Sequence, residues 1–237
     1  MKLLRKILLV VFVVVLVGCV FVGLMGYNLY NSAVSKISLR DKVEEVRGNE
    51  NFVVFSDLPD DLVNATIAVE DHRFREHGSI DLISIGRAMS ANIKAKDAVE
   101  GGSTITQQVA KNLYFMTEKE NISRKSAELI LSYYLEKNYS KDEIFELYVN
   151  TIYYGNGYYG IKEASNGYLN KEPKDLTLDE ATMLAGIPNA PSVYAPTANM
   201  NLTLSRQKKV ISTMVENKYL TQEQADELVK MQEKETP

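Results

Sequence analysis

Gly101-Gly102-Ser103-Thr104-Ile105-Thr106-Gln107-Gln108 is the most informative stretch of this chain, and it precedes a predicted helix that carries Lys111. Two glycines followed by hydroxyl and amide side chains form a loop that can bring backbone N–H groups close to an anion at a helix start. The stretch lacks the Gly-Lys-Ser/Thr ending of a nucleotide-binding P-loop. Taken alone, it is equally consistent with a Ser or Thr side chain that only caps a helix.

An upstream cluster of charged residues, Glu70-Asp71-His72-Arg73-Phe74, lies at the end of a helix predicted from Leu62 to about Asp71. The pair His77-Gly78 comes just after it. A buried glutamate near a helix end can have its proton affinity tuned by its surroundings and act as a general base. Taken alone, however, the cluster is better explained as a solvated helix end with ordinary ion pairs.

A downstream cluster, Arg124-Lys125-Ser126-Ala127-Glu128, places two cations and a carboxylate on one face of a helix. Arg124 and Glu128 have i,i+4 spacing and Lys125 and Glu128 have i,i+3 spacing, so these side chains can meet. Two cations suit a phosphate group, with the carboxylate holding or orienting one of them. A surface salt bridge, which contributes little to stability, is the simpler explanation for this cluster alone.

The rest of the chain after residue 51 has mostly helical patterning. Capping boxes mark three helix starts, at Ser140…Glu143, Thr177…Glu180 and Thr221…Gln224. The tyrosine- and glycine-rich stretch 153–160 predicts a loop, and Phe52-Val53-Val54-Phe55 is a short β-rich segment. We find no internal repeat, so the sequence predicts one mostly α domain with a few short strands at most.

The amino-terminal segment Ile7–Tyr27 is uncharged and dominated by Val, Leu, Ile and Phe, and Lys2, Arg5 and Lys6 precede it. About 20 apolar residues suffice for a transmembrane helix. The positive-inside rule then keeps the short amino end in the cytoplasm and places the rest of the chain outside. A cleaved signal peptide and a lipidated Cys19, after the lipobox-like Leu16-Val17-Gly18, are the alternatives, and the long apolar run disfavours both.

These features divide the chain into five expected parts: a cytoplasmic end at 1–6, a transmembrane helix at 7–27, a polar stalk at 28–51, a globular domain at 52–220, and a C-terminal helix or tail at 221–237. The 237 residues carry a formal net charge of −4, with one cysteine and two histidines. We therefore expect no disulfide, no zinc site and no nucleic-acid partner, and any metal would be a hard cation on oxygen ligands.

Taken in order, the three clusters resemble successive motifs of the peptidoglycan glycosyltransferases of family 51, the transglycosylase domain of class A penicillin-binding proteins and of their monofunctional relatives. The resemblance continues through 141–150 and Tyr153-Tyr154-Gly155, ends near 206–211, and covers roughly 52–219. The last motif of the family usually begins with two arginines, and Gln207 stands at the second position here. The chain therefore departs from the family pattern at that second position.

The resemblance implies a mainly α, lysozyme-like fold and the polymerisation of lipid II into β-1,4-linked glycan strands, with inversion at the donor sugar. Glu70 matches the catalytic base of the family. Glu128 matches its second essential carboxylate, which orients the basic group or holds a divalent cation, Mg²⁺ or Mn²⁺. The positions expected to bind substrate are Asp71, Arg73, Ser103, Thr104, Gln107, Gln108, Lys111, Arg124 and Lys125.

The expected partners are lipid II, the growing lipid-linked glycan chain, the cytoplasmic membrane and other proteins of cell-wall synthesis. The apolar segment Leu82–Met89 either dips into the membrane interface or forms an ordinary core helix. Two other functions compete with polymerisation: a lysozyme-like enzyme that cleaves glycans, and a non-catalytic scaffold of the cell-wall machinery. From the length and the lack of a Lys-Thr-Gly motif we expect no penicillin-binding domain.

Overall fold

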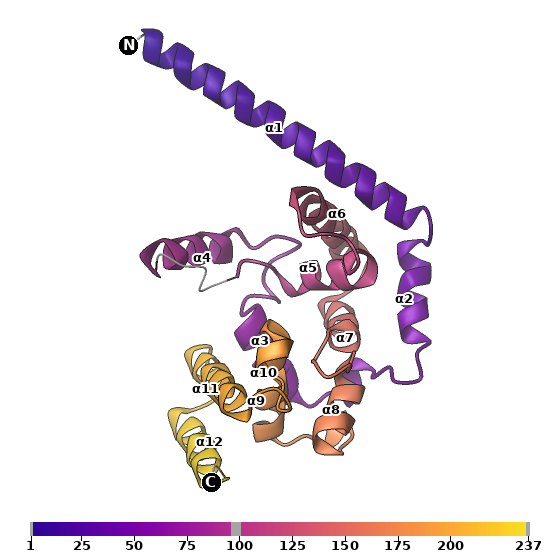
Figure 1. Ribbon diagram of the computed structural model, residues 1–237, viewed down its shortest axis with the longest axis vertical. Helices are drawn as coiled ribbons and strands as arrows, with labels where there is room; N and C mark the ends of the chain where they lie inside the picture. The colour runs from indigo at the N-terminus through magenta and orange to yellow at the C-terminus, as the bar shows by residue number, and fades with distance from the viewer. Residues whose placement is uncertain (1, 96–100, 236–237) are drawn as a thin grey trace.

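The computed structural model describes residues 2–95 and 101–235, and these residues are mainly helical, as expected (Figure 1). Residue 1 of the expected cytoplasmic end and residues 236–237 of the expected tail lie outside the described residues. The α-helices are α1 (Lys2–Val34), α2 (Leu39–Arg47), α3 (Asp60–Glu70), α4 (Leu82–Ala95), α5 (Ile105–Ala110), α6 (Ile122–Asn138), α7 (Lys141–Thr151), α8 (Ile161–Leu169), α9 (Leu178–Gly186), α10 (Pro191–Tyr194), α11 (Met200–Glu216) and α12 (Gln222–Glu235). Short 3-10 turns lie at Phe55–Asp57, Pro173–Asp175 and Ile187–Asn189, and a π-helical turn lies at Lys111–Phe115.

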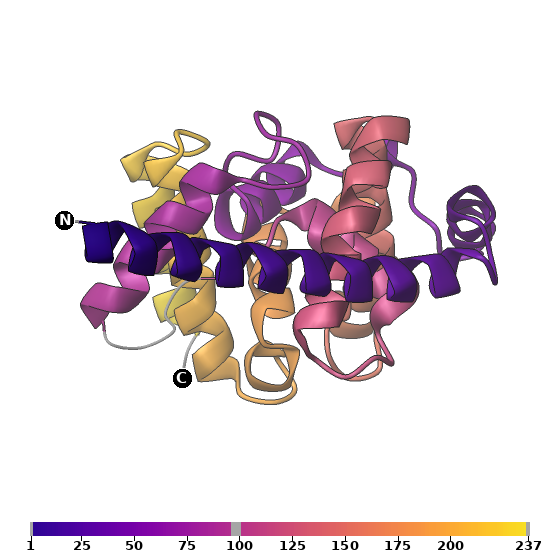
Figure 2. The same ribbon diagram turned by 90° about the horizontal axis from the view of Figure 1, so that it is seen from above.

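Helix α1 is long and apolar enough to cross a membrane, with a mean hydropathy of 3.4 over its most apolar 18-residue window. None of that window is buried inside the protein. Figure 1 shows the amino-terminal part of α1 projecting away from the helical domain, and in Figure 2, seen from above, the same helix passes in front of the domain. The helix contains the expected span 7–27 and continues unbroken to Val34.

The segment 28–51 differs from the polar stalk that the sequence predicts. The end of α1 and the whole of α2 pack on the domain, and Val43 is completely buried in the main core. Leu39, Val43 and Val46 are spaced by one helical turn, so they form a narrow apolar stripe in an otherwise charged helix. Such a sparse stripe is easily missed in the sequence, but it is enough to dock a short helix.

The β-rich segment Phe52–Phe55 forms no strand. Its backbone pairs with a side chain instead: Val53 N–H donates to Asn150 Oδ1 at 2.8 Å, and Asn150 Nδ2 donates back to Val53 O at 2.8 Å. Phe55 N–H donates to Glu146 Oε2 in the same way. Because α7 supplies these partners, the extended segment needs no neighbouring strand to satisfy its backbone.

Two apolar clusters hold the domain together. The main core lies among α5, α6, α7 and α9, and Phe74, Phe115 and Phe145 are completely buried within it. The second cluster joins α3, α9, α11 and α12 through Ala65, Val210 and other small or aliphatic residues. Helix α3 therefore runs between the two clusters, and its last residue, Glu70, is held from both sides.

The turn chemistry predicted from the sequence is confirmed. Reciprocal side-chain and backbone hydrogen bonds form at all three capping boxes, which begin α7, α9 and α12. In the loop 153–160, Gly155, Gly157 and Gly160 have φ values of 85°, 84° and 86°, which L side chains rarely adopt. A Cβ atom at Gly160 would also lie 2.9 Å from Asn150 O, so this turn requires glycine.

Candidate active site

Glu70 is the last residue of α3, and its side chain is 9% exposed. Its Oε2 accepts a hydrogen bond from Gln108 Nε2 on α5 at 2.9 Å. Its Oε1 lies 3.8 Å from Arg206 Nη2 on α11 and has no hydrogen-bond partner among the described residues. One carboxylate is thus held between an amide from one helix and a cation from another.

Burial raises the pKa of Glu70 above its usual value. The hydrogen bond from Gln108 and the charge of Arg206 oppose this effect, while the neighbouring Asp71 adds to it. The rings of Tyr148 and Tyr154 are almost completely buried, and burial together with the charge of Glu70 raises their pKa values. Both phenols therefore stay neutral, and they give Glu70 the low-dielectric surroundings that favour proton uptake.

Arg206 begins the last motif, 206–211, and the sequence assigns it no role. Its Nε donates to Gly186 O at 3.3 Å, and its guanidinium lies over the Tyr194 ring at 5.7 Å from the centroid. These contacts fix the guanidinium beside Glu70. The approach of α11 to α3 is a long-range contact that no local spacing predicts.

Gln207, the position that departs from the family pattern, points away from Glu70. Its amide donates to Asp179 O at 2.8 Å, Asp179 Oδ1 at 2.9 Å and Thr182 Oγ1 at 3.0 Å. The side chain is almost fully buried. Gln207 therefore ties α11 to the first turn of α9, which is a structural role that needs no positive charge.

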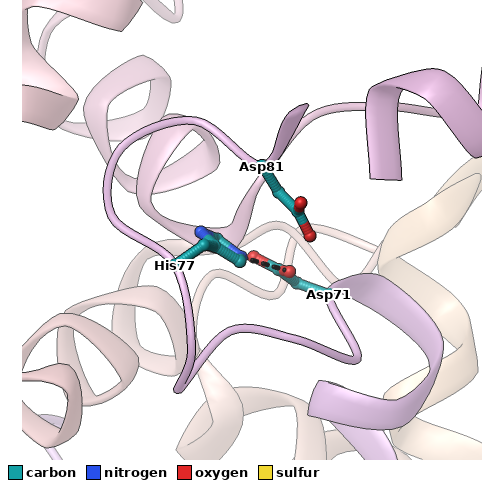
Figure 3. Close-up of side chains that lie close together, drawn as sticks. All are labelled: Asp71, His77 and Asp81. Atoms are coloured by element: carbon teal, nitrogen blue, oxygen red, sulfur yellow. Dashed lines mark hydrogen bonds and ion pairs between the residues drawn. The ribbon is translucent and has the colours of Figure 1, made fainter. Parts of the chain in front are cut away.

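Asp71, which follows the last residue of α3, contacts His77 in the next loop (Figure 3) and the first residue of α5. Asp71 Oδ1 lies 2.7 Å from His77 Nε2, and Asp71 Oδ2 accepts from Ile105 N–H at 3.0 Å. Burial lowers the pKa of His77, but the hydrogen bond to Asp71 outweighs it and the pKa is raised overall. Two further predicted residues act in this connection, because Thr104 Oγ1 caps α5 and Gln107 Nε2 donates to Ser79 O.

Asp81 completes a group with Asp71 and His77 whose ligand atoms lie within 4.8 Å of one another, as a metal site would require (Figure 3). Its oxygens already accept from Ile83 N–H, Ser84 N–H and Ser84 Oγ. Arg73 Nε lies 3.2 Å from Asp81 Oδ2. Burial alone would raise the pKa of Asp81, but the hydrogen bonds from Ser84 and Ile83 lower it to about 2. The group thus fits a hydrogen-bonded brace better than a set of free metal ligands.

The basic cluster on α6 has the geometry that its spacing predicts. Glu128 is 3% exposed, with Arg124 Nε 3.1 Å from Oε1 and Lys125 Nζ 3.2 Å from Oε2. Lys125 is 45% exposed, and its Nζ also donates to Ser103 Oγ at 2.8 Å. Since both oxygens of Glu128 face cations, Glu128 does not fit a divalent cation held by this chain alone.

The three sequence clusters come together around α5. Gln108, within α5, contacts Glu70, and Ser103, just before α5, contacts Lys125. Lys111 opens the π-helical turn that follows α5 directly and is half-buried. The arrangement defines a site with the buried carboxylate of Glu70 on one side and, on the other, the exposed cation of Lys125 beside the buried Arg124. Such a site can accept a proton and bind an anion at the same time.

Fold and site together define a mainly helical domain with one apolar helix suited to a membrane. The family described as Transglycosylase matches residues 38–215. Penicillin-binding protein 1F of Bacillus subtilis (strain 168) is 38% identical over 219 residues, which are 89% of this chain and 30% of that protein. Penicillin-binding protein 1A of Neisseria lactamica is 46% identical over 176 residues, which are 74% of this chain and 22% of that protein.

The chain belongs to the transglycosylase family. The crystal structure of penicillin-binding protein 1A from Haemophilus influenzae is 24% identical, with a TM-score of 0.45 over 76% of this chain and 17% of that one. The chain spans less than a third of the length of these relatives.

Proposed function

We propose that this chain polymerises lipid II into β-1,4-linked glycan strands, with Glu70 as general base. One observation supports the proposal most strongly: the residues just before and within α5 hold a buried carboxylate through Gln108 and an exposed cation through Ser103. Glycan transfer from a lipid pyrophosphate needs a base for the acceptor and cations for the leaving group. The segment from Ser103 to Gln108 contacts both the candidate base, Glu70, and a candidate phosphate-binding cation, Lys125.

In the proposed reaction, the 4-hydroxyl oxygen of the acceptor GlcNAc attacks the anomeric carbon of the donor from the face opposite the pyrophosphate. The bond between that carbon and the pyrophosphate oxygen breaks, and the configuration inverts from α to β. The acceptor proton passes to the Glu70 carboxylate, whose raised pKa improves it as a base. The bonding electrons leave with the undecaprenyl pyrophosphate.

Arg124, Lys125 and Lys111 are assigned to the departing pyrophosphate. Cations placed in advance where negative charge develops are usually the largest electrostatic contribution to catalysis. Glu128 would act through its two ion pairs, keeping Arg124 and Lys125 in place rather than touching the sugar. Four further residues have a supporting role, because their contacts hold the loop 71–81 and the start of α5 in place beside Glu70: Asp71, Arg73, Thr104 and Gln107.

The resemblance implies a divalent cation. Both oxygens of Glu128 already pair with Arg124 and Lys125, so Glu128 offers no free ligand atom to such a cation. We therefore assign charge neutralisation to the α6 cations and expect a chelator to slow polymerisation without abolishing it. The measurement is the glycan chain-length distribution from purified enzyme and lipid II with and without EDTA. Complete loss of polymer, restored by Mg²⁺ or Mn²⁺, would contradict this assignment.

Membrane attachment follows from two elements. Helix α1 would span the bilayer, with Lys2, Arg5 and Lys6 in the cytoplasm and the domain outside. Helix α4 is not a core helix: Leu82 is 77% exposed, and Ile83, Met89 and Ile93 are also exposed. Both elements project to the same side of the domain (Figures 1 and 2), so α4 would enter the interface where α1 crosses it. The lipid tail of the substrate can then remain in the bilayer.

Paired incubations test this function against the glycan-cleaving and scaffold alternatives. Purified full-length chain is given lipid II in one reaction and finished peptidoglycan in the other. Longer glycan chains from lipid II support polymerisation. Release of soluble fragments from finished peptidoglycan, without growth from lipid II, would identify a cleaving enzyme, and no change in either reaction would identify a scaffold.

A further inference from the structure

Helix α1 approaches α6 unusually closely at Gly26, which is the buried residue of α1. A Cβ atom at Gly26 would lie 2.3 Å from Ser126 Oγ, 2.4 Å from Ser126 Cβ and 2.9 Å from the Ser126 carbonyl carbon. These distances leave no room for a side chain at position 26. The backbone of α1 therefore packs directly against the Ser126 side chain of α6. By contrast, Gly18 and Gly23 on the same helix have nothing within 4 Å of an added Cβ.

Aromatic and polar contacts on both sides of Gly26 hold the same interface together. Tyr30 stacks on Tyr134 of α6, with ring centroids 5.3 Å apart and an interplanar angle of 3°. Ser123 Oγ donates to Met25 Sδ at 3.8 Å. Just past the end of α1, Tyr114 Oη donates to Ile37 O at 2.9 Å. The last part of α1 is therefore a packed element of the domain rather than a loose tether.

The packed residue on α6, Ser126, lies in the same helical turn as the basic cluster. Arg124 and Glu128 are each two residues from Ser126, which puts them on the opposite side of α6. That side is buried and faces the domain, and Lys125 reaches Ser103 from the same turn. Helix α6 thus lies between α1 and the segment that leads into α5. Contact with α1 on the side opposite the basic cluster therefore limits where α6 can lie.

We propose that Gly26 is a positioning residue for transglycosylation, because its missing side chain sets the distance between the membrane helix and the α6 turn that carries Arg124, Lys125 and Glu128. This inference rests on the proposed role of those cations in binding the pyrophosphate. The membrane helix is fixed relative to the lipid, so the close contact also fixes the cations relative to the substrate headgroup. Wider spacing at Gly26 would displace α6 toward α5 or tilt it away.

The test compares Gly26→Ala with Gly23→Ala and Gly18→Ala in the full-length chain, with lipid II polymerisation as the readout. Misplacement of a binding group by about 1 Å can cost a hundredfold in rate, so we expect Gly26→Ala to lower kcat/KM for lipid II about tenfold to a hundredfold. Both control variants should stay within twofold of the original enzyme. A Gly26→Ala enzyme that matches the controls overturns the proposal.

A compensating substitution separates positioning from general damage. Ser126→Gly removes the two atoms that an added Cβ would meet first, Oγ and Cβ. The double variant Gly26→Ala/Ser126→Gly should therefore regain most of the lost kcat/KM, and the regained activity should appear mainly as a lower KM. If the double variant is as poor as Gly26→Ala, or if activity only follows the folded fraction measured by thermal melting, the positioning role is wrong.

Lys125→Ala, measured in parallel, distinguishes failure of this inference from failure of the proposed function. If Lys125→Ala is defective while Gly26→Ala behaves like its controls, the cations act as proposed and α1 does not position them. If Lys125→Ala keeps normal kinetic constants, the assignment of the α6 cluster to the pyrophosphate is wrong, and the positioning role falls with it.

Discussion

At the scale of single residues, the site depends on how one carboxylate is surrounded. Glu70 gains proton affinity from burial beside Tyr148 and Tyr154, and it loses part of that gain to Gln108 and Arg206. A general base works best when its pKa lies near the working pH. The opposing contributions let the protein raise the pKa of Glu70 while keeping enough of the carboxylate ionised to take a proton.

The first prediction concerns Arg206, whose charge lowers the pKa of Glu70. In Arg206→Gln that effect is gone, so the pKa of Glu70 rises further. A base loses activity as the pH falls through its pKa, and the acid limb of kcat/KM should therefore move to higher pH. The measurement is the pH profile of lipid II polymerisation, with Arg206→Lys as the control that keeps the charge. An unshifted acid limb in Arg206→Gln would show that Arg206 only packs.

A second residue-scale prediction concerns Asp81, which is 3% exposed and has a pKa lowered to about 2. Its ionised form stabilises the fold above the ordinary aspartate pKa of about 3.9, and this stabilisation is lost as the pH falls toward about 2. Asp81→Asn should cost on the order of 2 kcal/mol at neutral pH. For a chain of this size that corresponds to roughly 4–8 °C in melting temperature.

The predicted loss of stability is measured from melting curves of Asp81→Asn and the original chain at pH 7 and at a series of lower pH values. The difference between the two melting temperatures should narrow as the pH falls from about 4 toward about 2, because Asp81 takes up a proton in the unfolded chain before it does so in the folded one. A difference that stays constant down to the acid limit would mean that the hydrogen-bond geometry, not the charge of Asp81, provides the stability.

At the scale of helices, contacts within one element were predictable and contacts between elements were not. The spacing of Arg124, Lys125 and Glu128 fixes their ion pairs, because residues three and four apart meet on any helix. The capping boxes follow the same local logic. The contact of Gln108 with Glu70 joins residues far apart in sequence, and only the family resemblance indicated that their clusters belong together.

The missed features share a physical cause. The docking of α2 depends on three apolar residues in a charged helix, and Val53 finds its backbone partner in the side chain of Asn150. Arg206 reaches Glu70 only because α11 packs on α3. In each case tertiary packing selects a partner that local sequence preference does not identify.

The prediction at this scale concerns Glu128, which holds both cations of α6 in place. Glu128→Gln removes the charge but keeps the size, so Arg124 and Lys125 are no longer held by ion pairs. We expect kcat/KM for lipid II to fall at least tenfold for the folded enzyme, and the melting temperature to fall as well, because the buried Arg124 loses an ion-pair partner. Glu118→Gln, an exposed glutamate before the same helix, is the control. A near-normal rate for Glu128→Gln would show that the ion pairs of Glu128 are not needed to place Arg124 and Lys125 for catalysis.

At the scale of the whole molecule, the apolar helix α1 and the candidate site form one unit. The apolar part of α1 is free of the domain, whereas its last part packs on the helix that carries the basic cluster. The apolar residues Leu82, Ile83, Met89 and Ile93 of α4 are exposed. A substrate with a lipid tail and a pyrophosphate headgroup would meet first the bilayer, then the cations of α6, and then Glu70.

The central claim is that Glu70 is the base of a lipid II polymerase. Glu70→Gln keeps the shape of the side chain and removes the carboxylate, so it should abolish glycan chain growth from lipid II while melting stays near that of the original chain. Glu50→Gln, at an exposed position, is the matched control and should polymerise normally. Chain growth by purified Glu70→Gln at a rate close to that of Glu50→Gln would contradict the account.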